Sequence, residues 1–184
     1  MNSILSISSI DGRYSAITNV LEYYFSEYAL FRYRVKVEID YFKKLCDILN
    51  INAINVGLLN KIKDEFNQTE CLKIKQIESE INHDVKAVEI YIGNNFAKNN
   101  HLHKNLIHFG LTSQDINNVS ISLSIKDYLN DIYYINIVKI LNLIDKRVNL
   151  WKDNVIICRT HGQSAVPSTM GKEFKVFMYR LQKE

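Results

Sequence analysis

The chain has 184 residues, of which 47% are hydrophobic and 23% are charged, and its formal net charge is +3. This balance is typical of a globular protein, and so small a charge, scattered along the chain, gives no support for a nucleic-acid-binding surface. With 6 glycines and 1 proline, the composition favours long helices over a turn-rich β fold.

The three cysteines, Cys46, Cys71 and Cys158, are far apart, and no paired Cys or Cys/His spacing accompanies them. We therefore expect neither a zinc site nor a disulfide framework, and a reducing compartment fits best. Residues 1–10 lack the basic start of a signal peptide, and no apolar run approaches the length needed to cross a membrane. We expect a soluble, cytoplasmic protein.

Apolar residues at steps of three and four predict helices in the first half of the chain. Residues 1–18 look irregular, a long helix is expected over 21–49 and a shorter one over 58–66, and a third apolar stripe covers 74–96. Residues 99–108 are expected to form a connection.

The segment 114–151 is apolar around much of its circumference. One stripe on it consists of Ile121, Ile125, Tyr128, Ile132, Ile135, Val138, Leu141, Ile144, Val148 and Trp151. Such a helix needs neighbours on several sides, and a chain of this length cannot cover it alone. We therefore predict a bundle built from several chains.

After this helix the sequence predicts an apolar, extended stretch at 155–158 and a loop at 159–168, followed by a helix that begins near 167–169. The expected fold class is all-α, with an N-terminal helical domain at 1–111. Residues 112–184 are then the start of a long-helix bundle domain.

Two polar segments in the first half of the chain are candidates for chemistry. Asp11-Gly12-Arg13-Tyr14 combines a turn-forming glycine with an arginine that can hold a phosphate, although a surface turn with a salt bridge would look the same. His83, in Asn82-His83-Asp84, is expected inside the third helix, facing away from the core. It is free to face a cleft, or it is simply a solvent-facing histidine.

Two further segments lie around the long helix. Thr112 and Asp115 fit a capping box, and a helix start with hydroxyls and a nearby His108 is also suited to an anion. In Arg159-Thr160-His161-Gly162-Gln163, His161 is a candidate proton donor, or a histidine that only orders the turn. The chain contains no P-loop, no HExxH and no GxSxG motif.

These segments, in this order, resemble the adenylosuccinate lyases of the fumarase/aspartase superfamily. The matching stretches are Ser9-Ile10-Asp11-Gly12-Arg13-Tyr14, Phe25-Ser26-Glu27-Tyr28, Asn82-His83-Asp84-Val85-Lys86-Ala87-Val88-Glu89, Thr112-Ser113-Gln114-Asp115-Ile116-Asn117-Asn118 and Arg159-Thr160-His161-Gly162-Gln163. The threonine-serine stretch is general to the superfamily. The Asn-His-Asp and Arg-Thr-His-Gly-Gln segments together distinguish this family.

The resemblance implies a role for each candidate residue. His161 is expected to be the general acid that protonates the leaving nitrogen, with His83 as its helper. Arg13, Tyr14 and His108 are expected to contact the nucleotide phosphate. Thr112 and Ser113 are expected to contact a carboxylate of the succinyl group. Further substrate contacts are expected from Asn82, Asp84 and Gln163.

The reaction implied is β-elimination of fumarate, from adenylosuccinate to give AMP and from the related imidazole-carboxamide ribotide. It needs no cofactor or metal, and it takes place in a homotetramer. Ser164 and Gln114 depart from the usual family residues without removing a role. The family's serine-rich loop, which carries the general base, is absent from this sequence, so the chain alone is expected to be inactive. Two alternatives are another fumarate-releasing lyase and a non-catalytic helical oligomerisation module.

Overall fold

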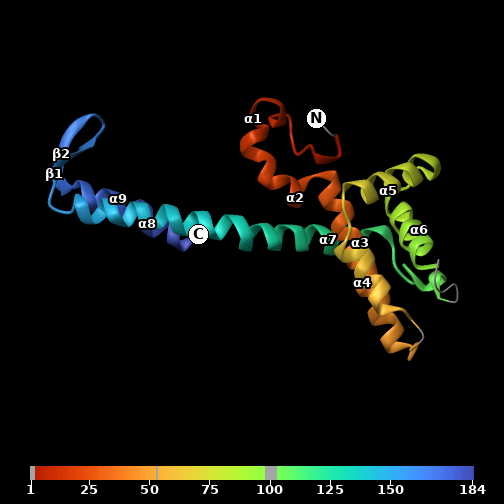
Figure 1. The fold of residues 1–184 in the computed structure, drawn as a ribbon. Helices are drawn as coiled ribbons and strands as arrows, with labels where there is room; N and C mark the ends of the chain where they lie inside the picture. The colour runs from red at the N-terminus through yellow and green to blue at the C-terminus, as the bar shows by residue number, and fades with distance from the viewer. Residues whose placement is uncertain (1–2, 53, 98–102) are drawn as a thin grey trace. The chain divides into compact units, whose positions relative to one another are not determined.

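The computed structural model describes residues 3–52, 54–97 and 103–184, and Figure 1 shows the fold. By contacts the chain divides into two compact units, residues 1–128 and residues 129–184. The sequence-based boundary at 111/112 differs from this division, because it follows the expected start of a long helix and not the density of contacts. Among the described helices, none is long and apolar enough to cross a membrane.

The first unit is helical. Its elements are η1 (Ser3–Leu5), α1 (Asp11–Thr18), η2 (Asn19–Leu21), α2 (Glu22–Phe25), α3 (Glu27–Ile48), α4 (Val56–Asp64), α5 (Gln68–Ile81), α6 (Asp84–Ala97), η3 (Lys104–Leu106) and α7 (Ser113–Tyr128). The predicted helix over 58–66 is confirmed within two residues at each end. Residues 99–102 of the expected connection lie outside the described residues.

Helix α3 is the centre of this unit, since α4, α5, α6 and α7 all pack against it (Figure 1). It begins at Ser26, whose Oγ accepts a hydrogen bond from the backbone N–H of Ala29 at 3.1 Å. It ends in a Schellman motif, in which Asn50 takes a positive φ and the N–H of Ile51 bonds to the carbonyl of Cys46 at 2.9 Å. Its apolar stripe, which includes Phe31, Val35, Ile39, Phe42 and Cys46, forms the buried core with residues of α4, α5 and α6.

Two expected helices prove to be interrupted. The stripe at 21–49 breaks at Ser26, which is extended and caps α3. The stripe at 74–96 breaks at Asn82 and His83, so the prediction that His83 lies inside a helix is wrong. The expectation of an irregular N-terminus is also corrected, because Asp11–Thr18 is helical.

The second unit consists of η4 (Leu129–Tyr133), a short π-helical segment, α8 (Tyr134–Leu150), a hairpin of β1 (Val155–Thr160) and β2 (Gln163–Thr169), and α9 (Met170–Lys183). α9 packs along α8 (Figure 1), and the Trp151 and Phe174 rings meet edge to face at 5.1 Å. The helical fold class is confirmed, and the antiparallel hairpin is its one departure among the described residues.

The hairpin corrects the expected loop at 159–168. Thr160 pairs with Gln163, so the loop is reduced to a two-residue turn. One extra residue of β2 lies between the pairs Ile157–Pro167 and Arg159–Ser164, which makes a β-bulge next to the proline. Pro167 therefore lies in a strand, and α9 begins instead at Met170, capped by Thr169 Oγ1.

Candidate functional site

The first predicted segment lies in the opening turn of α1. Arg13 and Tyr14 are both exposed, and the guanidinium lies 5.6 Å from the centre of the Tyr14 ring. The expected tight turn at Gly12 is wrong, because the residue is helical. Asp11 is buried, and its carboxylate accepts hydrogen bonds from the backbone N–H groups of Ile7 and Ser8, which fixes the chain leading into the helix.

The second segment forms the link between α5 and α6. Asn82 ends α5 with a φ of 55°, a left-handed conformation that asparagine tolerates better than most residues. His83 then caps α6, since its Nδ1 accepts a hydrogen bond from the backbone N–H of Lys86 at 3.1 Å. A neutral ring that accepts at Nδ1 carries its proton on Nε2, so His83 presents an N–H donor from a half-exposed side chain.

Asp84 follows His83 and is bound by a buried arginine. Its Oδ2 lies 2.6 Å from Nη2 of Arg34, a side chain that is 5% exposed as a residue. Burial opposes ionisation of Asp84, but the backbone N–H of Val85 and the Arg34 guanidinium outweigh it and hold the pKa of this carboxyl below its usual value. The link is therefore tied to α3.

The third segment begins at His108, which has a φ of 62°. Its Nδ1 lies 2.6 Å from Oε1 of Glu38, a residue of α3 with no exposed surface. Burial raises the pKa of Glu38, and the neighbouring His108 offsets part of that rise. Tyr41 supports the same link by donating from its hydroxyl to the carbonyl of Phe109 at 2.6 Å.

The start of α7 follows this link. The Asp115 carboxylate accepts from the backbone N–H of Thr112 at 2.8 Å and from its hydroxyl at 3.1 Å, which is the reciprocal half of the predicted capping box. The backbone N–H and then the hydroxyl of Thr112 lower the pKa of Asp115. Thr112 is exposed and Ser113 is half-buried, so a helix start with hydroxyl groups faces outward.

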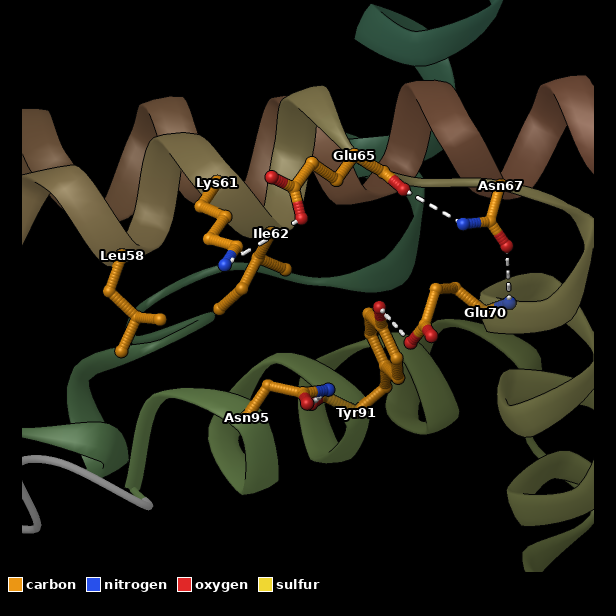
Figure 2. Close-up of a pocket in the computed structure, with 8 residues that line it drawn as sticks. All are labelled: Leu58, Lys61, Ile62, Glu65, Asn67, Glu70, Tyr91 and Asn95. Atoms are coloured by element: carbon orange, nitrogen blue, oxygen red, sulfur yellow. Dashed lines mark hydrogen bonds and ion pairs between the residues drawn. The ribbon is translucent and has the colours of Figure 1, made fainter.

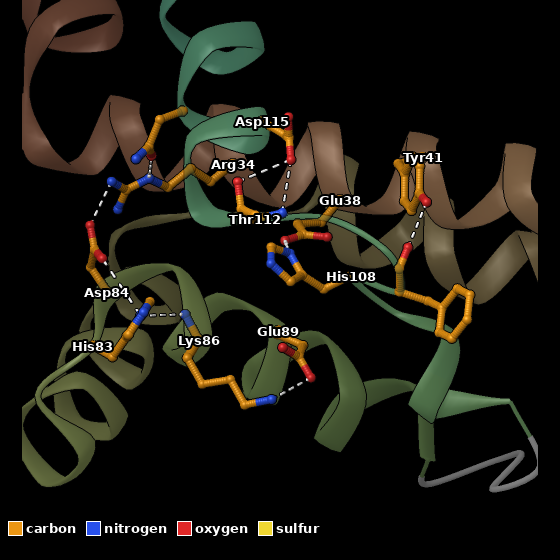
Figure 3. Close-up of polar contacts among 12 residues, drawn as sticks. Arg34, Glu38, Tyr41, His83, Asp84, Lys86, Glu89, His108, Thr112 and Asp115 are labelled. Carbon is orange, nitrogen blue, oxygen red and sulfur yellow. Dashed lines mark hydrogen bonds and ion pairs between the residues drawn. The ribbon is translucent and has the colours of Figure 1, made fainter.

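Figure 3 shows how these residues of the first unit lie together. Arg34 and Glu38 point from α3 toward the Asn82–Asp84 link and toward His108, and Thr112 and Asp115 lie beside them at the start of α7. Sequence reasoning missed Arg34 and Glu38. No sequence signal singles them out, because Arg32, Lys36 and Asp40 flank the same apolar stripe of α3 at the same spacing of four.

The fourth segment forms the tip of the hairpin in the second unit. His161 has a φ of 52° and Gly162 a φ of 77°, so both central residues of the turn are left-handed, as a type I′ turn requires. His161 and Gln163 are exposed, and the Arg159 guanidinium reaches the Gly162 carbonyl at 3.4 Å. The imidazole is therefore carried at the end of a two-stranded arm.

The predicted residues thus fall into separate groups. His83, Asp84, His108 and Thr112 belong to the cluster of Figure 3, and Asn82 and Ser113 are adjacent in sequence to His83 and Thr112. Arg13 and Tyr14 lie on α1, and His161 and Gln163 belong to the other contact unit. In the described part of the chain, no three His, Cys, Asp or Glu side chains are grouped so that they could hold a metal ion.

A cavity of about 300 Å³ lies elsewhere in the first unit and contains none of the predicted residues. Figure 2 shows it between α4, α5 and α6, with the Tyr91 hydroxyl donating to Glu70 at 2.8 Å. Its lining residues are Leu58, Lys61, Ile62, Glu65, Asn67, Glu70, Tyr91 and Asn95. It belongs to the packing of these helices and not to the histidine-bearing cluster.

Solved structures show what kind of fold this is. A fumarate lyase from Mesorhizobium sp. BNC1 superposes with a TM-score of 0.75 at 17% identity, covering 90% of this chain and 38% of that one. The β-carboxy-cis,cis-muconate cycloisomerase of Acinetobacter calcoaceticus gives a TM-score of 0.74 at 16% identity, covering 93% and 40%. At such low identities these matches establish the fold alone, and that fold is the one found in fumarate lyases.

Sequence comparison then places the chain in a family. A family model described as "Lyase" matches residues 12–184, so this chain belongs to that lyase family. Curated proteins named adenylosuccinate lyase match all of the chain, with 39% identity for Buchnera aphidicola of Acyrthosiphon pisum and 42% for Dictyostelium discoideum. The resemblance inferred from the sequence is therefore confirmed. The chain spans 42% of the length of each of these relatives.

Proposed function

We propose that this chain forms the N-terminal part of an adenylosuccinate lyase. The observation that carries the proposal is the identity of 39% and 42% over the whole chain to two relatives of that name. The reaction is elimination of fumarate from adenylosuccinate to give AMP, and from the succinyl-aminoimidazole-carboxamide ribotide. Both steps belong to purine synthesis.

The chemistry needs a proton donor for the leaving nitrogen. A base removes a proton from the carbon beside a carboxylate, that carboxylate stabilises the carbanion, and the carbon–nitrogen bond then breaks to release fumarate. His161 is the proposed general acid that gives its proton to the departing amine. His83, with a proton on Nε2, is its proposed helper.

Binding is assigned to the remaining candidates. Arg13, Tyr14 and His108 are proposed to hold the nucleotide phosphate, and Thr112 with Ser113 a succinyl carboxylate at the start of α7. Asn82, Asp84 and Gln163 complete the proposed substrate contacts. No cofactor or metal enters this scheme, and the general base is proposed to come from the part of the relatives that this chain does not match.

The proposed enzyme is a cytoplasmic homotetramer that builds its active sites from several subunits. Exposed apolar side chains on α8 support the assembly, among them Ile135, Val138 and Leu143. Within the chain the two groups of candidate histidines belong to different contact units, which is consistent with sites completed by other copies.

The test combines binding and turnover. AMP binding to the chain is measured by calorimetry, with Arg13→Met as the variant that should weaken it. Turnover is measured after co-expression with the C-terminal part of the Dictyostelium discoideum relative that follows the matched residues, hereafter the reconstituted lyase. Fumarate release is expected from adenylosuccinate and not from argininosuccinate.

Other outcomes identify the competing functions. Release from argininosuccinate alone would indicate a different lyase of the same fold. A reconstituted lyase that assembles stably but neither binds AMP nor releases fumarate would indicate a module that serves only oligomerisation. The exposed apolar side of α8 is the observation that favours the oligomerisation module.

A further inference from the structure

Two charged side chains of α3 are buried inside the first unit. Arg34 is 5% exposed and Glu38 is fully buried, and they lie four residues apart on one side of the helix. Burial of a charge is unfavourable unless the charge is paired and hydrogen-bonded. The groups that Arg34 and Glu38 contact therefore indicate the role of these two side chains.

Arg34 joins two segments that are distant in the sequence. Its Nη2 lies 2.6 Å from Oδ2 of Asp84, and its Nε donates to Oδ1 of Asn117 at 2.9 Å. Asp84 directly follows His83, and Asn117 lies in the turn of α7 that follows Thr112 and Ser113. One planar guanidinium thus connects the start of α6 with the start of α7, a geometry that the single ammonium of lysine cannot reproduce.

Glu38 binds the third segment. Its Oε1 lies 2.6 Å from Nδ1 of His108, so this ring nitrogen is engaged by the Glu38 carboxyl group. His108 is left-handed, and its carbonyl accepts from the N–H of Leu111 at 3.2 Å, immediately before Thr112. The His108 link is therefore anchored to the same face of α3 as the His83 link (Figure 3).

We propose that Arg34 and Glu38 are positioning residues, which hold His83, His108 and Thr112 in the arrangement that the substrate requires. They act through Asp84, Asn117 and His108, and neither is assigned a contact with substrate. This inference rests on the proposed function and deepens it. Stability alone does not explain the two charges, because apolar residues of similar volume often serve as well or better at buried ion pairs.

The experiment uses one substitution for each anchor and one matched control. Arg34→Lys keeps the charge and removes the fork, and Glu38→Gln keeps the size and removes the charge. Lys36→Met removes a cation from the same helix, where it forms an exposed ion pair with Asp40 at 3.5 Å. All three are made in the 184-residue chain and in the reconstituted lyase.

In the chain, amide hydrogen exchange reports on each link separately. The Lys86 amide is held by the His83 ring, and the Leu111 amide by the His108 carbonyl. Arg34→Lys should speed exchange at Lys86 by about tenfold or more, and Glu38→Gln should do so at Leu111, while amides inside α3 stay protected. Lys36→Met should change neither reporter.

In the reconstituted lyase, each anchor variant should lower kcat by about 10- to 100-fold with KM within about threefold, because misplaced groups reduce turnover more than binding. Wild-type exchange at both reporters, or an unchanged kcat, would overturn the proposal. If the wild-type reconstituted lyase releases no fumarate, the proposed function fails. The exchange comparison still decides whether α3 positions the two links.

Discussion

At the scale of single residues, a left-handed backbone marks several of the predicted site positions. Asn82, His108 and His161 all have positive φ values, between 52° and 62°. For residues other than glycine this conformation costs roughly 1–2 kcal/mol and persists only where the surroundings enforce it. Here the hydrogen-bonded links around Asn82 and His108 and the tight turn at His161 enforce it. The backbone conformation therefore positions the histidines as much as their side-chain contacts do.

We expect that His161 can be replaced by asparagine without loss of the turn. Asparagine is favoured in type I′ turns, so His161→Asn should keep the hairpin, as judged by cross-strand NMR contacts. Fumarate release by the reconstituted lyase should fall by about 10²- to 10⁴-fold, the usual contribution of a general acid. His103→Asn, outside the candidate site, is the control. Retention of activity by His161→Asn would remove the proposed general acid.

The Arg34–Asp84 contact predicts a pH dependence of stability. The pKa of Asp84 is lowered in the folded state, so its contribution is present above the unfolded value of about 3.9 and is lost as pH falls through the lower folded value. Asp84→Asn should therefore reduce the free energy of unfolding at about pH 6 and reduce it less near about pH 3. Urea titrations at the two pH values measure this, and an equal effect at both would contradict it.

Gly171 is required by a close approach of two backbone segments in the second unit. A Cβ atom there would lie 2.6 Å from the Val148 carbonyl oxygen and 2.7 Å from Lys152 Cα. Gly171→Ala should cost about 1–3 kcal/mol of unfolding free energy, because backbone atoms must move. Gly12→Ala is the matched control, since nothing lies within 4 Å of its Cβ position. A neutral Gly171→Ala would show that the ends of α8 and α9 can separate freely.

At the scale of secondary structure, periodicity located the helices but not their interruptions. The stripes at 21–49 and 74–96 continue across Ser26 and across Asn82–His83, because apolar spacing survives a short break in the backbone. Ser26 could have been recognised as a cap, since Glu27 and an apolar run follow it. Nothing in the sequence required a left-handed conformation at Asn82 or at His108.

The hairpin was missed for a different reason. A lone Pro167 and small polar residues suggested a loop, whereas Pro167 lies beside a bulge of a two-stranded sheet, where it needs no ladder bond. The His-Gly pair is an unusual variant of the Asn-Gly signal that predicts such turns. The candidate residues of the site came from the sequence, but their anchors, Arg34 and Glu38, came only from the structure.

The cap of α3 gives a prediction at this scale. Ser26 Oγ accepts from Ala29 N–H at 3.1 Å, and the residue is 2% exposed. Ser26→Ala should lower the free energy of unfolding by about 1 kcal/mol, as measured by urea titration. Ser79→Ala, at an exposed position inside α5, should be neutral or slightly stabilising, because alanine is the better helix former. Equal effects of the two would show that the cap contributes nothing.

At the scale of the whole molecule, apolar surface on α8 predicts association. Val138 is 53% exposed and Leu143 is 62% exposed on α8, although α9 packs along this helix. The chain should form oligomers at micromolar concentration, and Val138→Lys should shift sedimentation toward monomer. Val20→Lys is a matched control at 53% exposure in the first unit. A monodisperse wild-type monomer would contradict the proposed bundle.

The hairpin has a consequence for how far His161 can reach. Its ring is carried at the tip of β1 and β2, so the number of cross-strand pairs sets its distance from the base of the arm at α8 and α9. Insertion of one residue pair would advance the imidazole by about 3.4 Å and turn it to the opposite side of the ribbon. The length of the hairpin thus fixes where the His161 ring lies, and lengthened variants would test how precisely it must be placed for the proposed proton transfer.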